Sequence, residues 1–289
     1  MKLVIKKVHD WEYGVLGEFD FYQCPICGLM VLFPMPTLEE LKTFYPEDYH
    51  GFYTSDVGVI SFLYRLVYYF RFQEYLKLVG QRGRLLDVGC ADAPYFNLLR
   101  EQCPEIECVG IEFKDEIATK GRAKGRNIIT GTFSDLPDSE TFDLIIMNNL
   151  IEHVLDPVHE MQLAHAHLKK EGYLILETPN YESWDFYLAK KFWGGLHVPR
   201  HTFLFSPCSL ALMSSKVGFV LQKTFYLLNT DHWSLSVQNF LQNFSTFRCP
   251  IKKGRTWYYK YLLFAFIPLN YLQKLFRRTG VIKAVLKKV

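Results

Sequence analysis

The 289-residue chain is 49% hydrophobic and 22% charged, which predicts one large folded domain with attachments and excludes a low-complexity chain. Its seven cysteines are odd in number and scattered, which excludes a disulfide framework and favours a reducing, cytoplasmic location. Lys2, Lys6 and Lys7 bring charge too early for the apolar segment of a signal peptide.

The first 50 residues (1–50) have the features of a small N-terminal module. They contain a Cys24-x-x-Cys27 pair, and then Thr37 with a glutamate three residues later, a capping-box pattern that starts a short helix. A structural zinc site needs four ligands, which His9 or His50 would have to complete. Nothing in the spacing requires this, so we expect a degenerate metal knuckle kept as a turn.

Residues 51–230 are expected to form the main domain. An aromatic-rich helix is predicted over 58–80, and from residue 84 strands alternate with helices. The expected strands are 84–89, 107–112, 127–130, 142–148, 172–177 and 219–228, with 281–286 as a last strand beside 219–228. The expected helices are 94–102, 114–125, 156–170 and one that opens at 206 and ends before 218. This order predicts an α/β fold, a Rossmann-like doubly wound sheet of seven strands with helices on both faces. Ligands of such sheets bind beyond the carboxyl ends of the strands.

The turn after the first of these strands, residues 87–94, is expected to hold a cofactor. A dinucleotide fingerprint would need glycine where Ala91 and Pro94 stand, and Asp87 would repel a pyrophosphate. S-adenosylmethionine carries positive charge and no phosphate. Glu112, at the end of the second strand, lies where an acceptor for its ribose hydroxyls is expected. The sequence therefore favours S-adenosylmethionine as cofactor.

Several further stretches occur in a fixed order after this turn. They are Gly131–Pro137, Thr141–Ile146, Asn148–Pro157 with its Glu152-His153-x-x-Asp156-Pro157 pattern, Leu168–Asn180 and His197–Ser206. As a set they resemble class I S-adenosylmethionine-dependent methyltransferases over about residues 20–228. The family loop commonly reads Asp-x-Gly-x-Gly-x-Gly, and here Ala91 and Ala93 replace two glycines. Their methyl groups tighten the site without closing it if both residues keep a negative φ. The Cys-x-x-Cys pair matches a branch of the family with an N-terminal zinc-ribbon-like module.

The resemblance also implies roles for individual residues. Thr132 and Phe133 would lie against the adenine. The full set of expected cofactor-binding residues is Asp87, Gly89, Ala91, Glu112, Phe113, Thr132, Phe133 and Asn148.

Methyl transfer to oxygen or nitrogen is an in-line displacement that often needs a base. His153 follows the fourth strand, where the transferable methyl group should point, and is the preferred base, with His201 next. Arg200 is expected to hold an anion or the substrate. Some related ubiquinone-pathway O-methyltransferases bind a metal through Glu-x-x-Glu-His. Asn149 occupies the first position of that pattern here, so a divalent metal on Glu152 and His153 is an open alternative that the sequence does not favour.

Residues 231–289 are expected to form a basic, aromatic-rich helical insertion. From residue 232 onward the chain has 11 Lys and Arg and no Asp or Glu. The aromatic run 257–267 is too short to span a bilayer. Two alternatives remain open, a helix lying at an anionic membrane surface and a lid packed on the domain. A basic tail alone is weak evidence for nucleic acid, which is not an expected partner.

The sequence thus predicts an S-adenosylmethionine-dependent methyltransferase acting on a small or lipid-linked acceptor. The acceptor would be a glycosyl, isoprenoid or other natural-product compound, and O-methylation is favoured. The alternative is a catalytically degenerate binding protein that kept the fold, with Ala91 and Ala93 as signs of decay.

Overall fold

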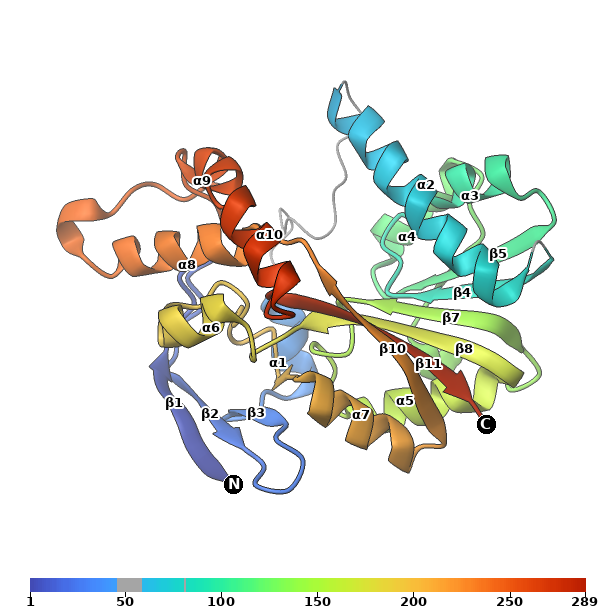
Figure 1. Ribbon diagram of the computed structural model, residues 1–289, viewed down its shortest axis with the longest axis horizontal. Helices are drawn as coiled ribbons and strands as arrows, with labels where there is room; N and C mark the ends of the chain where they lie inside the picture. Colours follow the sequence, from blue (N-terminus) through green and yellow to red (C-terminus); the bar gives the residue numbers. More distant parts are fainter. Residues whose placement is uncertain (46–58, 81) are drawn as a thin grey trace.

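A seven-stranded sheet forms the centre of the molecule (Figure 1). The structure is a computed structural model that describes residues 1–45, 59–80 and 82–289, with the backbone only for 59–67. The strand order is β10-β11-β8-β7-β4-β5-β6. The strands are β4 (Gly83–Val88), β5 (Ile106–Glu112), β6 (Ile128–Thr130), β7 (Phe142–Asn148), β8 (Leu168–Pro179), β10 (Phe219–Leu227) and β11 (Val281–Lys288). The predicted α/β fold is confirmed, and the expected last strand, β11, lies antiparallel between β8 and β10.

Helices cover both faces of this sheet. On one face lie α2 (Val59–Val79), α3 (Phe96–Gln102) and α4 (Asp115–Ala123), and on the other lie α5 (Pro157–His167) and α7 (Pro207–Lys216) (Figure 1). Neighbouring residues of a strand alternate between the two cores, as Leu144 and Ile145 do, because successive side chains point to opposite faces. Asp156 and Ser206 cap α5 and α7, and a proline occupies the first turn of each. These caps explain why both helices begin where the sequence predicts.

The N-terminal segment forms a second, four-stranded sheet with part of the main domain. Its order is β1-β2-β3-β9, from β1 (Lys2–Val8), β2 (Phe19–Gln23), β3 (Met30–Phe33) and β9 (Phe203–Leu204). The predicted helix α1 (Leu38–Thr43) follows, with the Thr37 capping box in place. Because β9 comes from the loop before α7, the N-terminal sheet is joined directly to the candidate site.

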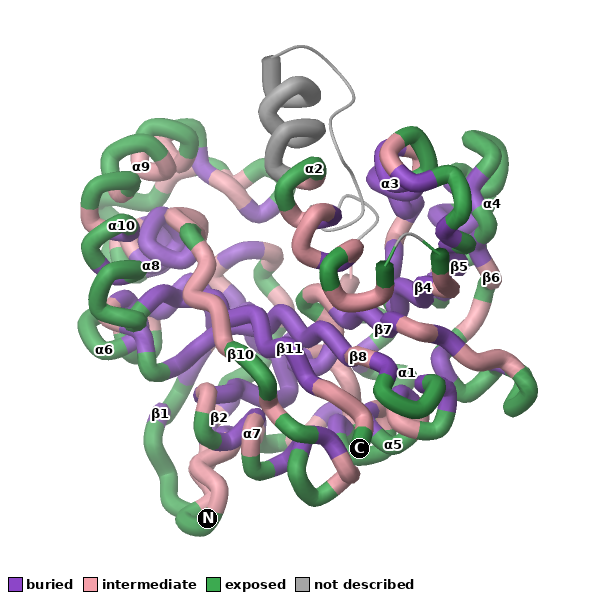
Figure 2. The backbone as a smooth tube through the Cα atoms, turned by 45° about the vertical axis from the view of Figure 1, so that its right-hand side comes forward, coloured by how far each residue is buried: buried purple, intermediate pink, exposed green. Residues whose placement is uncertain are grey.

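The segments before and within the C-terminal region are helical. They are α6 (Trp184–Ala189), α8 (Asp231–Gln242), α9 (Tyr259–Ala265) and α10 (Ile267–Leu275). Figure 2 shows that α6, α9 and α10 lie at the side of the molecule with much exposed surface, whereas α8, β8 and β11 are mostly buried. No helix in the described part of the chain is both long and apolar enough to cross a bilayer. The boundaries 1–50, 51–230 and 231–289 stay a prediction.

Candidate active site

The turn between β4 and α3 adopts a conformation that normally requires glycine. Gly89, Ala91 and Ala93 have φ of +73°, +50° and +47°. The condition that both alanines keep a negative φ is therefore not met. A left-handed conformation costs an L-residue roughly 1–2 kcal/mol. The loop thus keeps the backbone path of a glycine loop in spite of its alanines, and such strain is typical of functional sites.

Glu112, at the end of β5, fixes this loop from the neighbouring strand. Its Oε2 accepts a hydrogen bond from the backbone N–H of Ala91, and its Oε1 accepts one from Lys114, both at 3.0 Å. Burial raises the pKa of Glu112. Each carboxylate oxygen has a second lone pair, so Glu112 can hold the loop and still accept a hydroxyl from a ligand.

The polar side chains at the carboxyl ends of β4, β5 and β7 are hydrogen-bond acceptors. Asp87 is buried and accepts a hydrogen bond of 2.5 Å from the Tyr95 hydroxyl, and burial raises the pKa of Asp87 to about 7. Oδ1 of Asn148 is buried without a donor among the described residues. A cationic ligand that offers N–H and O–H groups fits these acceptors, whereas a phosphate does not. The ammonium and ribose hydroxyls of S-adenosylmethionine meet that requirement.

The residues expected beside the adenine differ in whether a ligand can reach their side chains. The ring of Phe133 is buried and stacks on His167 with centroids 5.6 Å apart. It therefore packs in the core and is not available to an adenine. The hydroxyl and N–H of Thr132 both bond to Asp135 and cap a short 3-10 turn. Phe113 is 44% exposed next to Glu112, so its ring can lie against a ligand.

His153 and His201 are brought together beyond the end of β7. Their rings meet edge to face with centroids 4.5 Å apart. Nδ1 of His153 lies 2.8 Å from the Tyr45 hydroxyl and 3.1 Å from the carbonyl oxygen of Arg200. Nδ1 of His201 lies 2.9 Å from the carbonyl oxygen of Gly195. Burial lowers the pKa of His153 to about 4 and that of His201 well below its usual range, so both rings are neutral.

Backbone and hydroxyl contacts of Thr202 explain this pairing. The N–H of Thr202 donates to the carbonyl oxygen of Glu152 at 2.8 Å, and its hydroxyl donates to the carbonyl oxygens of Glu152 and Val154. The loop that carries His201 is thereby docked on the segment that carries His153. The Glu152 side chain is fully buried, and burial raises its pKa to about 8.

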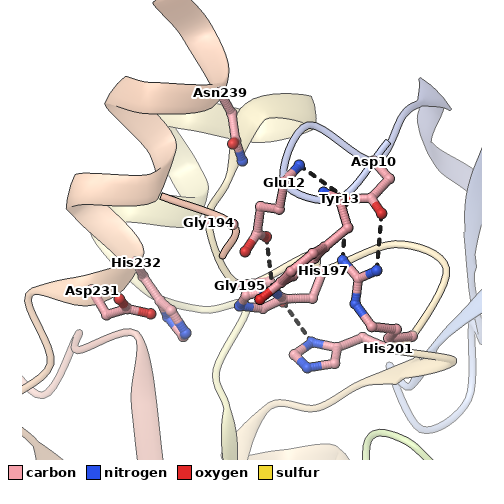
Figure 3. A network of polar contacts seen from close by, with 12 residues as sticks. Asp10, Glu12, Tyr13, Gly194, Gly195, His197, His201, Asp231, His232 and Asn239 are labelled. Atoms are coloured by element: carbon pink, nitrogen blue, oxygen red, sulfur yellow. Dashed lines mark hydrogen bonds and ion pairs between the residues drawn. The ribbon is translucent and has the colours of Figure 1, made fainter. Parts of the chain in front are cut away.

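Arg200 does not have the expected position of a substrate holder. It is fully buried, and its guanidinium donates to both carboxylate oxygens of Asp10 at 2.9 and 3.1 Å and lies over the ring of Tyr13 (Figure 3). This ion pair joins the N-terminal segment to the loop next to His201. Arg200 therefore anchors the site rather than reaching a ligand.

A second set of buried charges continues from this ion pair. Glu12 lies 2.7 Å from Nδ1 of His197 and 2.9 Å from the Arg255 guanidinium, and the rings of His197 and His201 have centroids 4.8 Å apart (Figure 3). Three distant parts of the chain thus meet beside the histidine pair. The roles of Asp10, Glu12 and Tyr45 were missed from the sequence, because no spacing pattern links them to residues 152–201.

The Cys24-x-x-Cys27 pair forms a turn, with the Gly28 N–H donating to the carbonyl oxygen of Cys24. All seven cysteines are free. Within the described ranges no third metal-ligating side chain joins the pair. His9 instead contacts Gly17 and Glu18, and His50 lies outside the described residues. The zinc-ribbon branch is not confirmed.

Comparison with known proteins decides the family. A family model described as a methyltransferase domain matches residues 65–224, more than half of the chain. The chain belongs to this methyltransferase family. S-adenosylmethionine, the predicted cofactor of this methyltransferase, suits the acceptors at the ends of β4, β5 and β7. No curated protein matches the sequence significantly.

Solved structures share the fold at low sequence identity. A S-adenosylmethionine-dependent methyltransferase from Archaeoglobus fulgidus is 18% identical, with a TM-score of 0.50, over 78% of this chain and 94% of its own. Coclaurine N-methyltransferase, solved with N-methylheliamine and S-adenosylhomocysteine, is 14% identical with a TM-score of 0.51, over 87% and 81%. A plantazolicin methyltransferase, solved with S-adenosylhomocysteine, is 15% identical with a TM-score of 0.50, over 89% and 91%.

Proposed function

We propose that this methyltransferase transfers the methyl group to an oxygen of a small or lipid-linked acceptor of the glycosyl, isoprenoid or natural-product type. The observation that carries the proposal is the neutral His153–His201 pair beyond β7, next to the strand ends that hold the cofactor residues. S-adenosylmethionine supplies an electrophilic methyl group when bound. A neutral imidazole beside an acceptor hydroxyl can take up its proton, and His153 is the preferred group.

The alternative of a degenerate binding protein is less well supported. Ala91 and Ala93 keep the left-handed backbone that the loop requires, at a cost in conformational energy. A loop without a function gains nothing from this strain. We take the strained loop as support for a working cofactor site.

A membrane surface as partner is supported by the outer faces of α9 and α10. The buried side chains of α10 are the polar Asn270 and Gln273, which bond to Asn229, Asp185 and the Trp233 indole. The large apolar side chains point outward instead. They are Trp257, Tyr261, Phe264, Ile267, Tyr271, Leu272, Leu275 and Phe276, between 40% and 76% exposed.

Basic side chains flank this apolar face. Lys260, Lys274, Arg277 and Arg278 are all exposed on the same helices or directly after them. Apolar side chains between basic ones fit the interface of an anionic bilayer. Of the expected interfacial aromatics, Phe266 is an exception, because it stacks on Trp233 with centroids 5.2 Å apart. The lid alternative accounts for Phe266 but not for the exposed residues.

The proposal is tested by titration and by turnover. The full chain is titrated calorimetrically with S-adenosylmethionine and S-adenosylhomocysteine. This measurement distinguishes an enzyme from a catalytically degenerate protein, and the acceptor need not be known. Methyl transfer from labelled cofactor is then compared between detergent-extracted lipids and water-soluble sugars or phenols. The expected result is a labelled methyl group in the lipid fraction. Reagents that cleave methyl ethers should release it, and reagents that act on methylamines should not. Label only on nitrogen or carbon would contradict O-methylation.

A further inference from the structure

Glu152, His153 and His201 form a group of three metal-ligating side chains beyond β7. One potential ligand atom of each residue lies within 4.8 Å of the other two. In residues 1–45, 59–80 and 82–289 no other group of three or more such side chains is this close. The sequence argued against a metal because Asn149 breaks the Glu-x-x-Glu-His pattern, but it could not show that His201 supplies a third ligand.

The two histidines have the hydrogen bonds that orient metal ligands. Nδ1 of each ring lies against a backbone carbonyl oxygen, of Arg200 for His153 and of Gly195 for His201. A carbonyl oxygen only accepts, so each Nδ1 carries the hydrogen, which the Tyr45 hydroxyl oxygen next to His153 accepts as well, and each Nε2 keeps its lone pair. Metal-ligating histidines typically donate their other N–H to a carbonyl or carboxylate in this way.

Glu152 provides an independent indication of a missing ligand. Its Oε2 accepts a hydrogen bond of 3.0 Å from the Thr178 hydroxyl, whereas its Oε1 is buried without a donor among the described residues. A buried carboxylate oxygen without a partner is costly. The guanidinium of Arg200, the residue directly before His201, is held by Asp10.

We propose that Glu152, His153 and His201 bind one divalent first-row transition-metal cation. Two imidazoles and one carboxylate suit cations such as Zn²⁺, Fe²⁺, Mn²⁺ and Co²⁺. Three protein ligands leave a coordination position for another oxygen. Binding of the cation does not depend on the proposed function.

A consequence for catalysis does rest on the proposed function. An acceptor hydroxyl bound at the open position would lose its proton to water more readily, because the cation lowers its pKa. His153 would then act as a ligand of the cation rather than as the group that takes up the proton.

The test measures metal binding in the absence of cofactor and acceptor. The parent protein is the full chain with Cys24→Ser and Cys27→Ser, which remove the other pair of strong metal ligands. Bound metal is removed with a chelator, and the protein is then titrated with Co²⁺ and Zn²⁺. One equivalent should bind, with the visible absorption of Co²⁺ in a nitrogen and oxygen environment. His201→Ala and Glu152→Gln should each weaken binding by more than about 100-fold, as loss of a direct ligand exceeds loss of a supporting contact.

The exposed His159 in the first turn of α5 provides a matched control, and His159→Ala should bind as the parent does. Glu152→Gln keeps an acceptor for Thr178, and circular dichroism checks that each variant is folded. Absence of binding to the parent protein, or binding to His201→Ala and Glu152→Gln that is as tight as binding to the parent, would overturn the site. Full methyl transfer by metal-free protein would overturn the catalytic consequence of the cation and leave the proposed function standing. Metal binding without methyl transfer would count against the proposed function alone.

Discussion

The imidazole rings of His153 and His201 meet edge to face, with centroids 4.5 Å apart, although one follows β7 and the other precedes β9. The contact depends on Thr202, whose N–H and hydroxyl bind the carbonyl oxygen of Glu152. A single polar residue thereby docks one loop on another. The histidine pair proposed to activate the acceptor is thus assembled from two distant segments.

His153→Ala is expected to lower turnover by roughly 10²–10⁴-fold, the usual contribution of a group that activates an acceptor. Cofactor affinity should not change, because the expected cofactor contacts come from β4, β5 and the end of β7. Initial rates and calorimetric titration measure the two effects separately. An unchanged rate in His153→Ala would move the role to His201 or to no base.

Glu112→Ala is expected to weaken S-adenosylmethionine binding by roughly 1.5–3 kcal/mol, the range for a hydrogen bond to a charged group. The variant also removes the acceptor for the Ala91 N–H, so the loop should become less ordered. Glu116→Ala is the control, because Glu116 is exposed and pairs with Lys120 on the surface. Equal dissociation constants for the two variants would remove Glu112 from the cofactor site.

Asp87→Asn is expected to stabilise the free protein while weakening cofactor binding. Burial raises the pKa of Asp87 from 3.8 to about 7, so between these values the folded state binds more protons than the unfolded state. Stability therefore falls as pH rises from about 4 to 7. The variant should melt several degrees above wild type at pH 8 and close to it at pH 4. Tighter cofactor binding in Asp87→Asn would contradict its role toward a cationic ligand.

Ala91→Gly is expected to relieve the left-handed strain of the cofactor loop. Relief of the strain should raise the free energy of unfolding by about 1–2 kcal/mol. The greater conformational freedom of glycine in the unfolded chain should lower it by about 0.5–1 kcal/mol. Chemical denaturation should show an unchanged or slightly higher stability, and titration a cofactor affinity at least as high. Ala123→Gly in α4, at an exposed helical position, should instead lose up to about 1 kcal/mol. Equal losses at both positions would contradict the strain.

Liposome flotation tests the proposed membrane surface. Removal of the C-terminal region would delete β11 from the central sheet, so substitutions at exposed residues are used instead. Phe264→Asp with Leu275→Asp should abolish flotation on anionic vesicles. Wild-type flotation should weaken with salt, because each basic residue near the surface contributes about 1 kcal/mol of screened attraction.

Leu16→Asp, at a residue that is 93% exposed in the N-terminal segment, is the matched control for flotation. It should float like wild type. If wild type does not float, the exposed face of α9 and α10 does not bind lipid, and the case for a lipid-linked acceptor weakens with it.

The sequence by itself determined the fold and the cofactor. Alternation of strands and helices, the caps at Asp156 and Ser206, and the polar residues at strand ends are local patterns, and local patterns persist in the folded state. Asp87 and Glu112 were placed correctly at the ends of neighbouring strands because parallel strands bring their carboxyl ends to one edge.

Only the tertiary structure decided what surrounds the reacting groups. Arg200 was expected to hold the substrate. Its guanidinium is instead buried in an ion pair with Asp10, 190 positions away in the chain. The left-handed φ of Ala91 and the inward ring of Phe133 depend on packing by other segments. The apolar outer face of α10 is set by polar contacts to Asn229 and Asp185. Such contacts join residues far apart in the chain, and no periodicity or spacing encodes them.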